Sequence, residues 1–338
     1  MTNLFRKAAV CTDIHFGLKS NSLVHNQDCE AFIDWFIATA KEQGCETGMF
    51  LGDWHHHRAS INLQTLHFSL RSLEKLSAAF DQFYFIPGNH DLYYRDKRDI
   101  HGAEWAQHLP NITVVNDWFQ SGDVVIAPWL VGDDHKKLNK MQAKYMFGHF
   151  ELPHFKMNAM VEMPDHGEVK VESFGGIESV YSGHFHLRQS KRNINYIGNC
   201  FPHNFADAGD DQRGMMILEW GQPKQYRAWP DQPLYRVMKL SEVIDHGAKI
   251  LVPNMHVRVE LDIDISYEEA NFIKETFIKD HSLREMALIP SKRTDIDIDM
   301  APGEVKFESV DQIVTDQLTN IESEFYDPKL LLKIYQNL

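Results

Sequence analysis

One pattern recurs five times in the first 200 residues: a short apolar run followed by a Gly- or Asp-containing turn rich in His, Asp and Asn. The runs are KAAVCTDIH, TGMFLGDW, FYFIPGNHD, KYMFGHF and SVYSGHFH. Their turns contain Asp13 and His15, then Asp53, then Asn89, His90 and Asp91, then His149, and last His184 and His186. Short runs of aliphatic, aromatic and β-branched residues bounded by Gly or Pro predict buried strands. Each polar turn is therefore expected at the end of a strand.

Two segments between the first three runs, DCEAFIDWFIATAKEQG and NLQTLHFSLRSLEKLSAAF, have the apolar spacing of helices. This alternation predicts a largely parallel central sheet with helices on its faces. Further strands are expected at NITVVND, DVVIAPWL, INYIGN and GMMILEW. The predicted fold class is α/β, a two-layered sheet sandwich flanked by helices. Ligands of such sheets bind beyond the carboxyl ends of the strands, where all five turns fall.

The organisation along the chain predicts a catalytic domain over residues 1–220 and a Pro- and Gly-containing connection over 221–250. A small α+β unit is expected over 251–302, with strands at MHVRVELDID and LREMALIP and a helix capped by Ser266 between them. Two helical segments follow in residues 303–338. Their apolar stripes can pack on their own domain or against a partner.

Charge and histidine content limit the function. A formal net charge of −14 excludes a generally basic, nucleic-acid-coating surface, so a polyanionic substrate must be attracted locally, by bound cations or small basic clusters. Of the 19 histidines, 16 precede residue 221, which places the chemistry in the first part. No stretch approaches the roughly 18 apolar residues of a membrane span. With no signal peptide expected and four cysteines without disulfide-like spacing, we predict a cytoplasmic protein.

The ordered set of turns predicts a shared metal site, although a lone histidine at a strand end is more often structural. Two divalent cations can hold the attacking and leaving oxygens of a phosphate displacement. They need a shared ligand, for which the Asp53 carboxylate is the candidate. The neutral amide of Asn89 limits the negative charge on the ions. Mixed nitrogen and oxygen ligands without thiolates suit Mn²⁺, with Mg²⁺, Fe or Zn as alternatives.

These turns resemble the calcineurin-like metallophosphoesterase superfamily over residues 10–200. The resemblance implies that one ion takes Asp13, His15, Asp53 and His186, and the other takes Asp53, Asn89, His149 and His184. It also implies that His90 contacts the scissile phosphate and helps to protonate the leaving oxygen, with Asp91 orienting it. A histidine suits this role because its ordinary pKa lies near neutrality.

Three consecutive histidines follow the second turn, in GDWHHHR. Adjacent side chains diverge, so the three cannot all face one ion. Nucleases of the SbcD type carry Asp or His three residues after the metal-binding Asp, which here is His56. We therefore predict that His56 contacts phosphate or supports a ligand, and that His55 and His57 are bystanders.

Three features are similar to the SbcD-type subunit, specifically the small subunit of tailed-phage recombination endonucleases. They are the motifs GDWHHHR and GNHD, the stretch YIGNCFPHNFAD, and the small unit followed by paired helices. Asn199 and Cys200 depart from the usual residues of that stretch. The resemblance implies a two-metal endo- or exonuclease acting on DNA ends in recombination or repair. It also implies a homodimer, an SbcC-type coiled-coil ATPase partner bound by the C-terminal helices, and the host cytoplasm if phage-encoded.

Two other functions stay open on the sequence. One is a small-molecule phosphodiesterase or phosphatase. The other is a DNA-end-binding scaffold subunit with an idle metal site, against which the intact ligand set argues. The basic clusters at 95–98, 135–140 and 188–192 are either solvated loops or contacts to DNA phosphates.

Overall fold

The computed structural model describes residues 3–157, 161–165 and 169–290. The chain divides into two compact units, residues 1–291 and 292–338. The predicted helical segment 303–338 and the end of the predicted small unit, 291–302, lie outside the described residues. The fold described is therefore that of the first unit.

The first of two six-stranded sheets has the order β12-β11-β1-β2-β3-β4. Its strands are β1 (Lys7–Cys11), β2 (Thr47–Phe50), β3 (Gln82–Phe85), β4 (Ile112–Val114), β11 (Gly214–Glu219) and β12 (Gln225–Ala228). The strands β1 to β4 are parallel, while β11 and β12 add antiparallel neighbours at the β1 edge. The parallel β1–β4 array brings three polar turns to the same edge.

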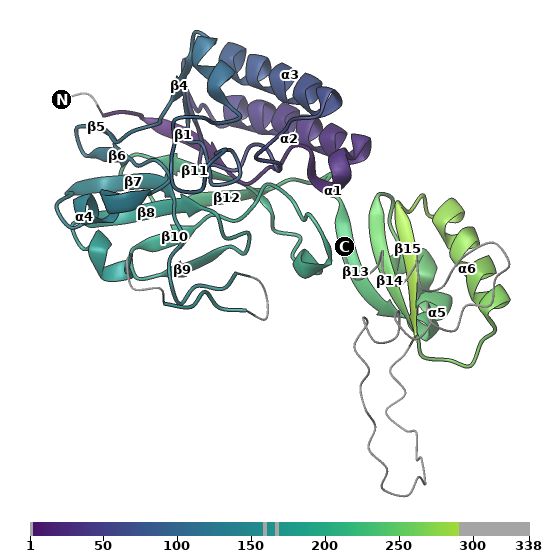
Figure 1. Ribbon diagram of the computed structural model, residues 1–338. Coiled ribbons are helices and arrows are strands. Elements are labelled where there is room, and N and C mark those ends of the chain that lie inside the picture. Colours follow the sequence, from purple (N-terminus) through teal and green to yellow (C-terminus); the bar gives the residue numbers. More distant parts are fainter. Residues whose placement is uncertain (1–2, 158–160, 166–168, 291–338) are drawn as a thin grey trace, which may run out of the picture. The chain divides into compact units, whose positions relative to one another are not determined.

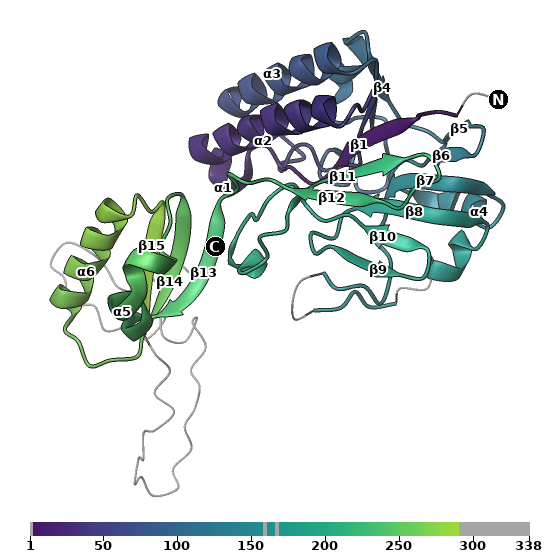
Figure 2. The ribbon, with the colours of Figure 1, turned by 180° about the vertical axis from the view of Figure 1, so that it is seen from behind.

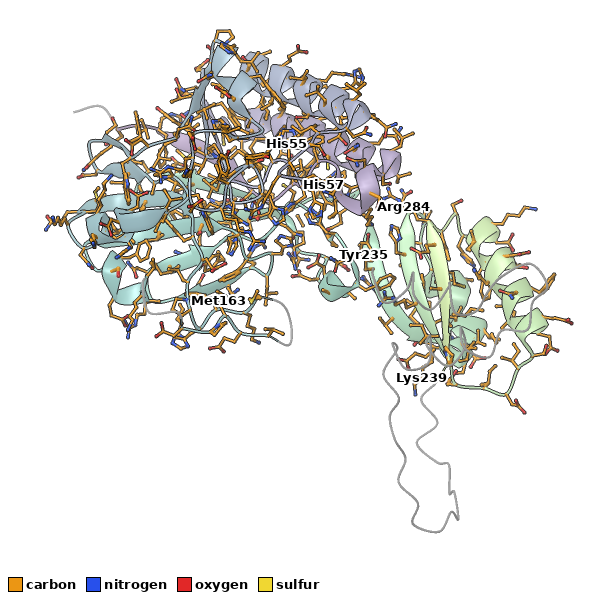
Figure 3. The ribbon with its side chains drawn as sticks, viewed as in Figure 1. His55, His57, Met163, Tyr235, Lys239 and Arg284 are labelled. Atoms are coloured by element: carbon orange, nitrogen blue, oxygen red, sulfur yellow. The ribbon has the colours of Figure 1, made fainter. Side chains whose placement is uncertain are left out.

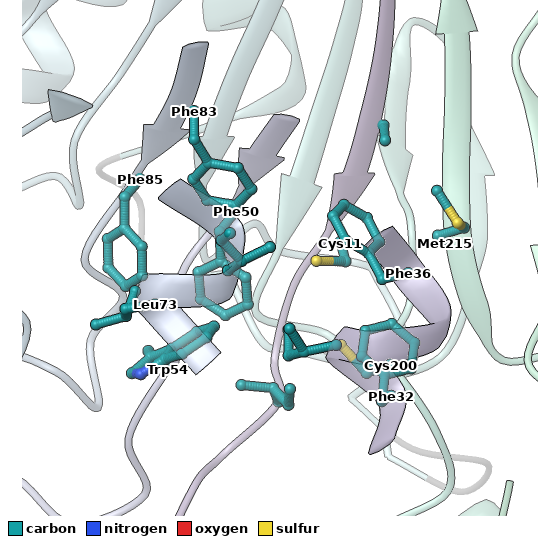
Figure 4. Close-up of a cluster of buried hydrophobic side chains, with 14 of the residues drawn as sticks. Cys11, Phe32, Phe36, Phe50, Trp54, Leu73, Phe83, Phe85, Cys200 and Met215 are labelled. Atoms are coloured by element: carbon teal, nitrogen blue, oxygen red, sulfur yellow. The ribbon is translucent and has the colours of Figure 1, made fainter. Parts of the chain in front are cut away.

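Two long helices, α2 (Leu23–Glu42) and α3 (Leu63–Ala79), pack side by side on this first sheet, after the short α1 (Leu18–Asn21) (Figures 1 and 2). The α3 helix begins where the Asn62 side chain accepts a hydrogen bond from the Gln64 N–H. The helices bury an aromatic core against the strands, shown in Figure 4 with Phe32 and Phe36 of α2 and Phe50 of β2. This layer fixes the strand ends from which the polar turns emerge.

The second sheet has the order β5-β6-β7-β8-β10-β9. Its strands are β5 (Phe119–Ser121), β6 (Val124–Ile126), β7 (Ala143–His149), β8 (Ile177–Gly183), β9 (Gln189–Lys191) and β10 (Ile194–Tyr196). A shared core between the sheets includes Val10 and Met49 from the first and Phe147 and Tyr181 from the second. Short helices complete the sandwich: η1 (Glu104–His108), η2 (Gly132–Asp134), α4 (His135–Leu138), η3 (Val171–Phe174) and η4 (Phe205–Asp207). The predicted α/β class and two-layered sandwich are confirmed.

The last described elements form a three-stranded parallel sheet with the order β13-β14-β15 and its own core. They are β13 (Leu234–Lys239), α5 (Leu240–Ile250), β14 (Met255–Leu261), α6 (Tyr267–Asp280) and β15 (Glu285–Pro290). The α6 helix starts with a capping box between Ser266 and Glu269. Residues 221–250, predicted as a connection, instead contain β12, β13 and α5. The Pro- and Gly-rich stretch ends at 233, and Tyr235, Leu240 and Val243 after it are buried.

None of the helices in the described ranges is long and apolar enough to cross a membrane.

Candidate metal centre

The five polar turns follow β1, β2, β3, β7 and β8, at the carboxyl ends of these strands. Their backbone is unusual at four predicted site residues, because φ is 54° at Asp13, 55° at His15, 62° at Asp53 and 88° at His184. Residues with a Cβ rarely adopt positive φ, and such strain concentrates at functional sites. The turns thus hold polar side chains in conformations that the surrounding packing must enforce.

Two glycines let neighbouring loops approach these side chains closely. A Cβ on Gly88 would lie 2.2 Å from the backbone nitrogen and from Oδ1 of Asp53. A Cβ on Gly52, where φ is 109°, would lie 2.3 Å from Nδ1 of His149. Only a residue without a side chain fits at either position, which explains why the turns read Gly-Asp and Gly-Asn.

The first candidate ligand set, here named the His149 group, consists of Asp53, Asn89, His149 and His184. Ligand atoms of Asp53, His149 and His184 all lie within 4.8 Å of one another. Nε2 of His149 lies 3.4 Å from Oδ2 of Asp53. Asn89 joins them, because its Oδ1 lies 3.1 Å from Nε2 of His149 and 2.9 Å from Nδ1 of His184. The structure thus brings together the four residues predicted to share one ion.

The second set, here named the His15 group, consists of Asp13, His15, Asp53 and His186. Ligand atoms of Asp13, His15 and Asp53 also lie within 4.8 Å of one another. Nε2 of His15 lies 3.7 Å from Oδ2 of Asp53 and 3.2 Å from Nε2 of His186. His186 in turn lies 3.9 Å from Oδ1 of Asp13. Asp53 therefore belongs to both groups, as a bridging carboxylate would.

The predicted catalytic histidine, His90, stands beside both groups. Its backbone N–H donates to Oδ1 of Asp53 at 2.8 Å, and its ring Nδ1 lies 2.8 Å from the carbonyl oxygen of His56. A carbonyl only accepts, so Nδ1 carries the hydrogen and Nε2 is the nitrogen that can exchange a proton. The His90 ring centroid lies 4.9 Å from that of His15. The ring is thus oriented beside the His15 group.

Asp91 does not orient the His90 ring directly, in contrast to the sequence-based expectation. Its carboxylate accepts three backbone N–H groups, from Gly88 at 2.9 Å, Trp54 at 3.0 Å and His55 at 2.8 Å. These bonds join the turn after β2 to the turn after β3. Asp91 thus connects the two turns, and the hydrogen bond of the His90 ring is made with the His56 carbonyl.

The three consecutive histidines have different surroundings, and His55 and His57 are labelled in Figure 3. His55 is buried, and its Nε2 lies 2.9 Å from Oγ of Ser69, a contact within the core. His57 is exposed. His56 faces the site, since its Nδ1 lies 3.5 Å from Nδ1 of His15. Among the three, His56 has its ring nearest the candidate ligands.

Two further residues at the site were not among the predicted ones. His203 is buried, and one of its ring nitrogens lies within 4.8 Å of ligand atoms of His15 and His186. Glu151 places Oε2 3.1 Å from Nε2 of His184. Glu151 lies two residues after the predicted ligand His149. An acidic residue so close to a ligand was a weak sequence signal for a residue of the site. His203 lies in YIGNCFPHNFAD, but not in a turn directly after a strand. The recurring pattern therefore did not include it.

A family model described as calcineurin-like phosphoesterase matches residues 6–188, more than half of the chain. The chain belongs to the calcineurin-like phosphoesterase family. The predicted resemblance to this superfamily is confirmed. The matched range includes every predicted ligand from Asp13 to His186, whereas His203 lies beyond it.

Individual relatives of this phosphoesterase are distant. The chain is 26% identical over 192 residues to exonuclease subunit 1 of Enterobacteria phage T4, a match covering 54% of this chain and 56% of the relative. It thus spans about half the length of that protein. Similar solved structures are the nuclease MPE of Pseudomonas putida, with 19% identity, 56% and 66% of the two chains covered and a TM-score of 0.28. Yfce, a phosphoesterase from E. coli, has 14% identity, coverage of 67% and 94% and a TM-score of 0.35. A dimetal phosphatase from Danio rerio has 10% identity, coverage of 67% and 97% and a TM-score of 0.41. These three TM-scores carry no inference about function.

The electrostatics of the two groups differ. Burial by itself would raise the pKa of Asp53, but His149 outweighs it and holds that pKa well below its ordinary value. Burial would likewise lower the pKa of His149, but the Asp53 carboxylate raises it to about 9. Burial lowers the pKa of His15 and of His203 well below the ordinary value, which keeps both rings neutral. Imidazole nitrogens, carboxylates and an amide oxygen are the donors that a divalent transition-metal ion accepts, so the residues fit such an ion, and His149 would release its proton on binding.

Proposed function

We propose that this phosphoesterase is a metal-dependent nuclease that hydrolyses phosphodiesters at DNA ends. The observation that carries the proposal is the position of His90. Its backbone binds Asp53, the residue common to both ligand groups, while the contact of Nδ1 with a carbonyl leaves Nε2 for proton transfer. The assignment of DNA as substrate rests on the similarity to exonuclease subunit 1 of Enterobacteria phage T4.

The two ligand groups are proposed to hold two divalent ions. The residues of the His15 group would hold one ion and those of the His149 group the other, with Asp53 common to both. Mn²⁺ suits this mixed nitrogen and oxygen set, with Mg²⁺, Fe or Zn as alternatives. When bound, the ions supply electrophilic stabilisation of charge on the phosphate.

The protein's own side chains would orient the reaction. His90 would donate a proton from Nε2 to the departing oxygen, because its Nδ1 is held by His56. The His56 ring, which is stacked on His90 with centroids 5.3 Å apart, would contact the phosphate. Through its three backbone hydrogen bonds, Asp91 would hold the turns after β2 and β3 in place. His90 then would not have to be reoriented in each catalytic cycle.

The loop that follows His90 offers features that suit a nucleic-acid substrate. Tyr93 and Tyr94 are 48% and 41% exposed, and partly exposed aromatic rings are groups on which bases can stack. The ammonium of Lys97 lies 5.4 Å from the ring centroid of Tyr94. Arg98, in the same basic cluster, instead binds Asp134 inside the protein and is not available to DNA. We assign DNA contact to the tyrosines and Lys97 within this cluster.

The proposal extends to the assembly. The relative is named a subunit, which supports a partner for this chain. We propose an SbcC-type coiled-coil ATPase that binds residues 303–338, and a homodimer formed through the catalytic domain. A role in recombination or repair of DNA in the host cytoplasm would follow if the chain is phage-encoded.

Two alternatives define the test. A small-molecule phosphodiesterase or phosphatase would use the same groups but need no exposed aromatic loop. A scaffold subunit with an idle site would not need the ligand sets, yet all seven predicted ligands lie together around Asp53.

Digestion of end-labelled linear duplex DNA by the full chain tests the function. The reactions contain Mn²⁺, Mg²⁺ or a chelator, and the wild type is compared with His90→Asn. We expect Mn²⁺-dependent cleavage that falls roughly 100-fold or more in the variant, because a general acid contributes that much. Rapid hydrolysis of a nitrophenyl phosphate ester without DNA cleavage would support the small-molecule alternative. No activity on either substrate, with or without the ATPase, would support the scaffold.

A further inference from the structure

Beyond the seven predicted ligands, the site contains a buried histidine whose ring has no polar partner. His203 is 1% exposed. Both of its ring nitrogens are buried and lack a hydrogen-bond partner. No other buried histidine in the described ranges has both ring nitrogens in this state. A buried polar atom without a partner costs about 1–3 kcal/mol and calls for an explanation such as a bound ion.

The His203 ring faces the His15 group. Ligand atoms of His15, His186 and His203 all lie within 4.8 Å of one another. The ring centroid of His203 lies 5.5 Å from that of His15 and 5.3 Å from that of His186, and it is nearly perpendicular to both rings. Three imidazoles that converge in this way can donate to one ion.

The backbone holds His203 in this position at both ends. Its N–H donates to Oδ2 of Asp207 at 2.9 Å, and its carbonyl accepts from the Tyr235 hydroxyl at 3.0 Å. Arg213, also buried, binds the Asp207 carboxylate at 3.2 Å and donates to the carbonyl of His186. One guanidinium therefore couples the loop of His203 to the loop of His186. The backbone that carries the His203 ring is therefore fixed at both ends, and ligands on a rigid support bind metal more tightly than mobile ones.

We propose that His203 is an additional ligand of the ion in the His15 group, which then has three imidazole nitrogens, from His15, His186 and His203. This inference rests on the proposed two-metal site. Such a nitrogen-rich set selects Mn, Fe or Zn over Mg²⁺, which prefers oxygen. The two ion positions then differ in their preference, since the His149 group has only two imidazoles.

The test follows the histidine rings during metal binding and does not depend on activity. The full chain is labelled with ¹⁵N in its histidine rings and titrated with Zn²⁺, which is diamagnetic. Signals absent from the spectrum of His203→Gln are assigned to His203. We expect these signals to move as the first zinc binds, because coordination changes the electron density at the bonded nitrogen.

Calorimetric titration measures the effect of the side chain on affinity. Removal of the ligand in His203→Gln and in His203→Leu should weaken binding of one zinc by about 10- to 100-fold. His101→Leu is the matched control, because His101 is buried, has an unpartnered Nδ1 and belongs to none of the metal-ligand groups among the described residues. It should keep wild-type affinity.

The outcomes separate this inference from the proposed function. Movement of the His203 signals with zinc supports the inference. If zinc binds and other histidine signals move while those of His203 stay in place, the ligand role is wrong and the two-metal proposal stands. If no histidine signal moves and no heat is released, both are wrong.

Discussion

The His149 and His15 groups share Asp53 but are held together differently. In the His149 group the imidazoles have partners within the protein: His149 contacts the Leu51 carbonyl at 2.7 Å and Asn89, and His184 contacts Asn89 and Glu151. In the His15 group the rings mostly face one another, with 3.2 Å between His15 and His186.

The two groups therefore differ in how far their polar atoms are satisfied without an ion. A salt bridge and neutral hydrogen bonds satisfy the His149 group, at least in part. Two imidazoles can share only one hydrogen, so a cluster of neutral rings leaves lone pairs facing each other. The His15 group is therefore expected to gain more from a cation than the His149 group does.

The largest effect is expected when Asp53, the residue common to both groups, is changed. Asp53→Asn removes the bridging charge, so both ions should bind more weakly and DNA cleavage should fall roughly 1000-fold, the upper range for loss of one electrostatic stabiliser. Steady-state cleavage and zinc titration measure the two effects. Asp34→Asn is the control, because Asp34 is an exposed residue of α2 that pairs with Lys75 at 2.7 Å. Loss of only one ion in Asp53→Asn would contradict a bridging role.

A smaller effect is expected on stability, with opposite pH dependence for His149 and for the pair His15 and His203 when a chelator is present. The pKa of His149 is raised to about 9, so its contribution to the free energy of unfolding is complete below the unfolded value of about 6.5 and is lost as the pH rises through 9. This loss amounts to roughly 3 kcal/mol, at 1.36 kcal/mol per pKa unit. The lowered pKa values of His15 and His203 act the other way, since the unfolded chain binds protons first and stability falls as the pH drops below about 6.5.

Urea unfolding between pH 4.5 and 9 measures both slopes. Asp53→Asn should flatten the alkaline slope, because His149 then loses the carboxylate that raises its pKa, and should retain the acid slope. An alkaline slope unchanged in this variant would show that Asp53 and His149 do not form the stabilising pair.

The sequence predicted the parts of this site that follow directly from a strand end. Asp13, Asp53 and Asn89 each come after a buried strand, within a turn whose residue types are typical of metal ligands. The parallel order of β1, β2 and β3 then brings their turns to one edge, because parallel strands have their carboxyl ends on the same side. Local pattern and topology are enough to assemble such residues.

The residues that were missed or misassigned depend on tertiary contacts. His203 reaches the site because Asp207, Arg213 and Tyr235 fold its loop back, and no local periodicity encodes these contacts. Asp91 was expected to orient His90, the residue before it, and the structure shows its carboxylate bound to backbone N–H groups, among them that of His55, 36 residues away. The strands and helix within 221–250 were missed because the Pro- and Gly-rich start of that range hid the apolar alternation after it.

The smallest change in activity should come from a substitution that adds a negative charge to the His149 group alone. Asn89→Asp keeps the shape of the side chain but adds a carboxylate beside His149 and His184. The added charge should tighten metal binding at the His149 group and lower kcat about tenfold, or 1.4 kcal/mol, because an ion with more negative ligands is a weaker electrophile. Asn89→Ser, which adds no charge, should instead weaken metal binding. Zinc titration together with kcat under saturating metal separates the two variants. A lower kcat in Asn89→Asp without tighter binding would mean that Asn89 acts through the geometry of the histidines and not through its neutral charge.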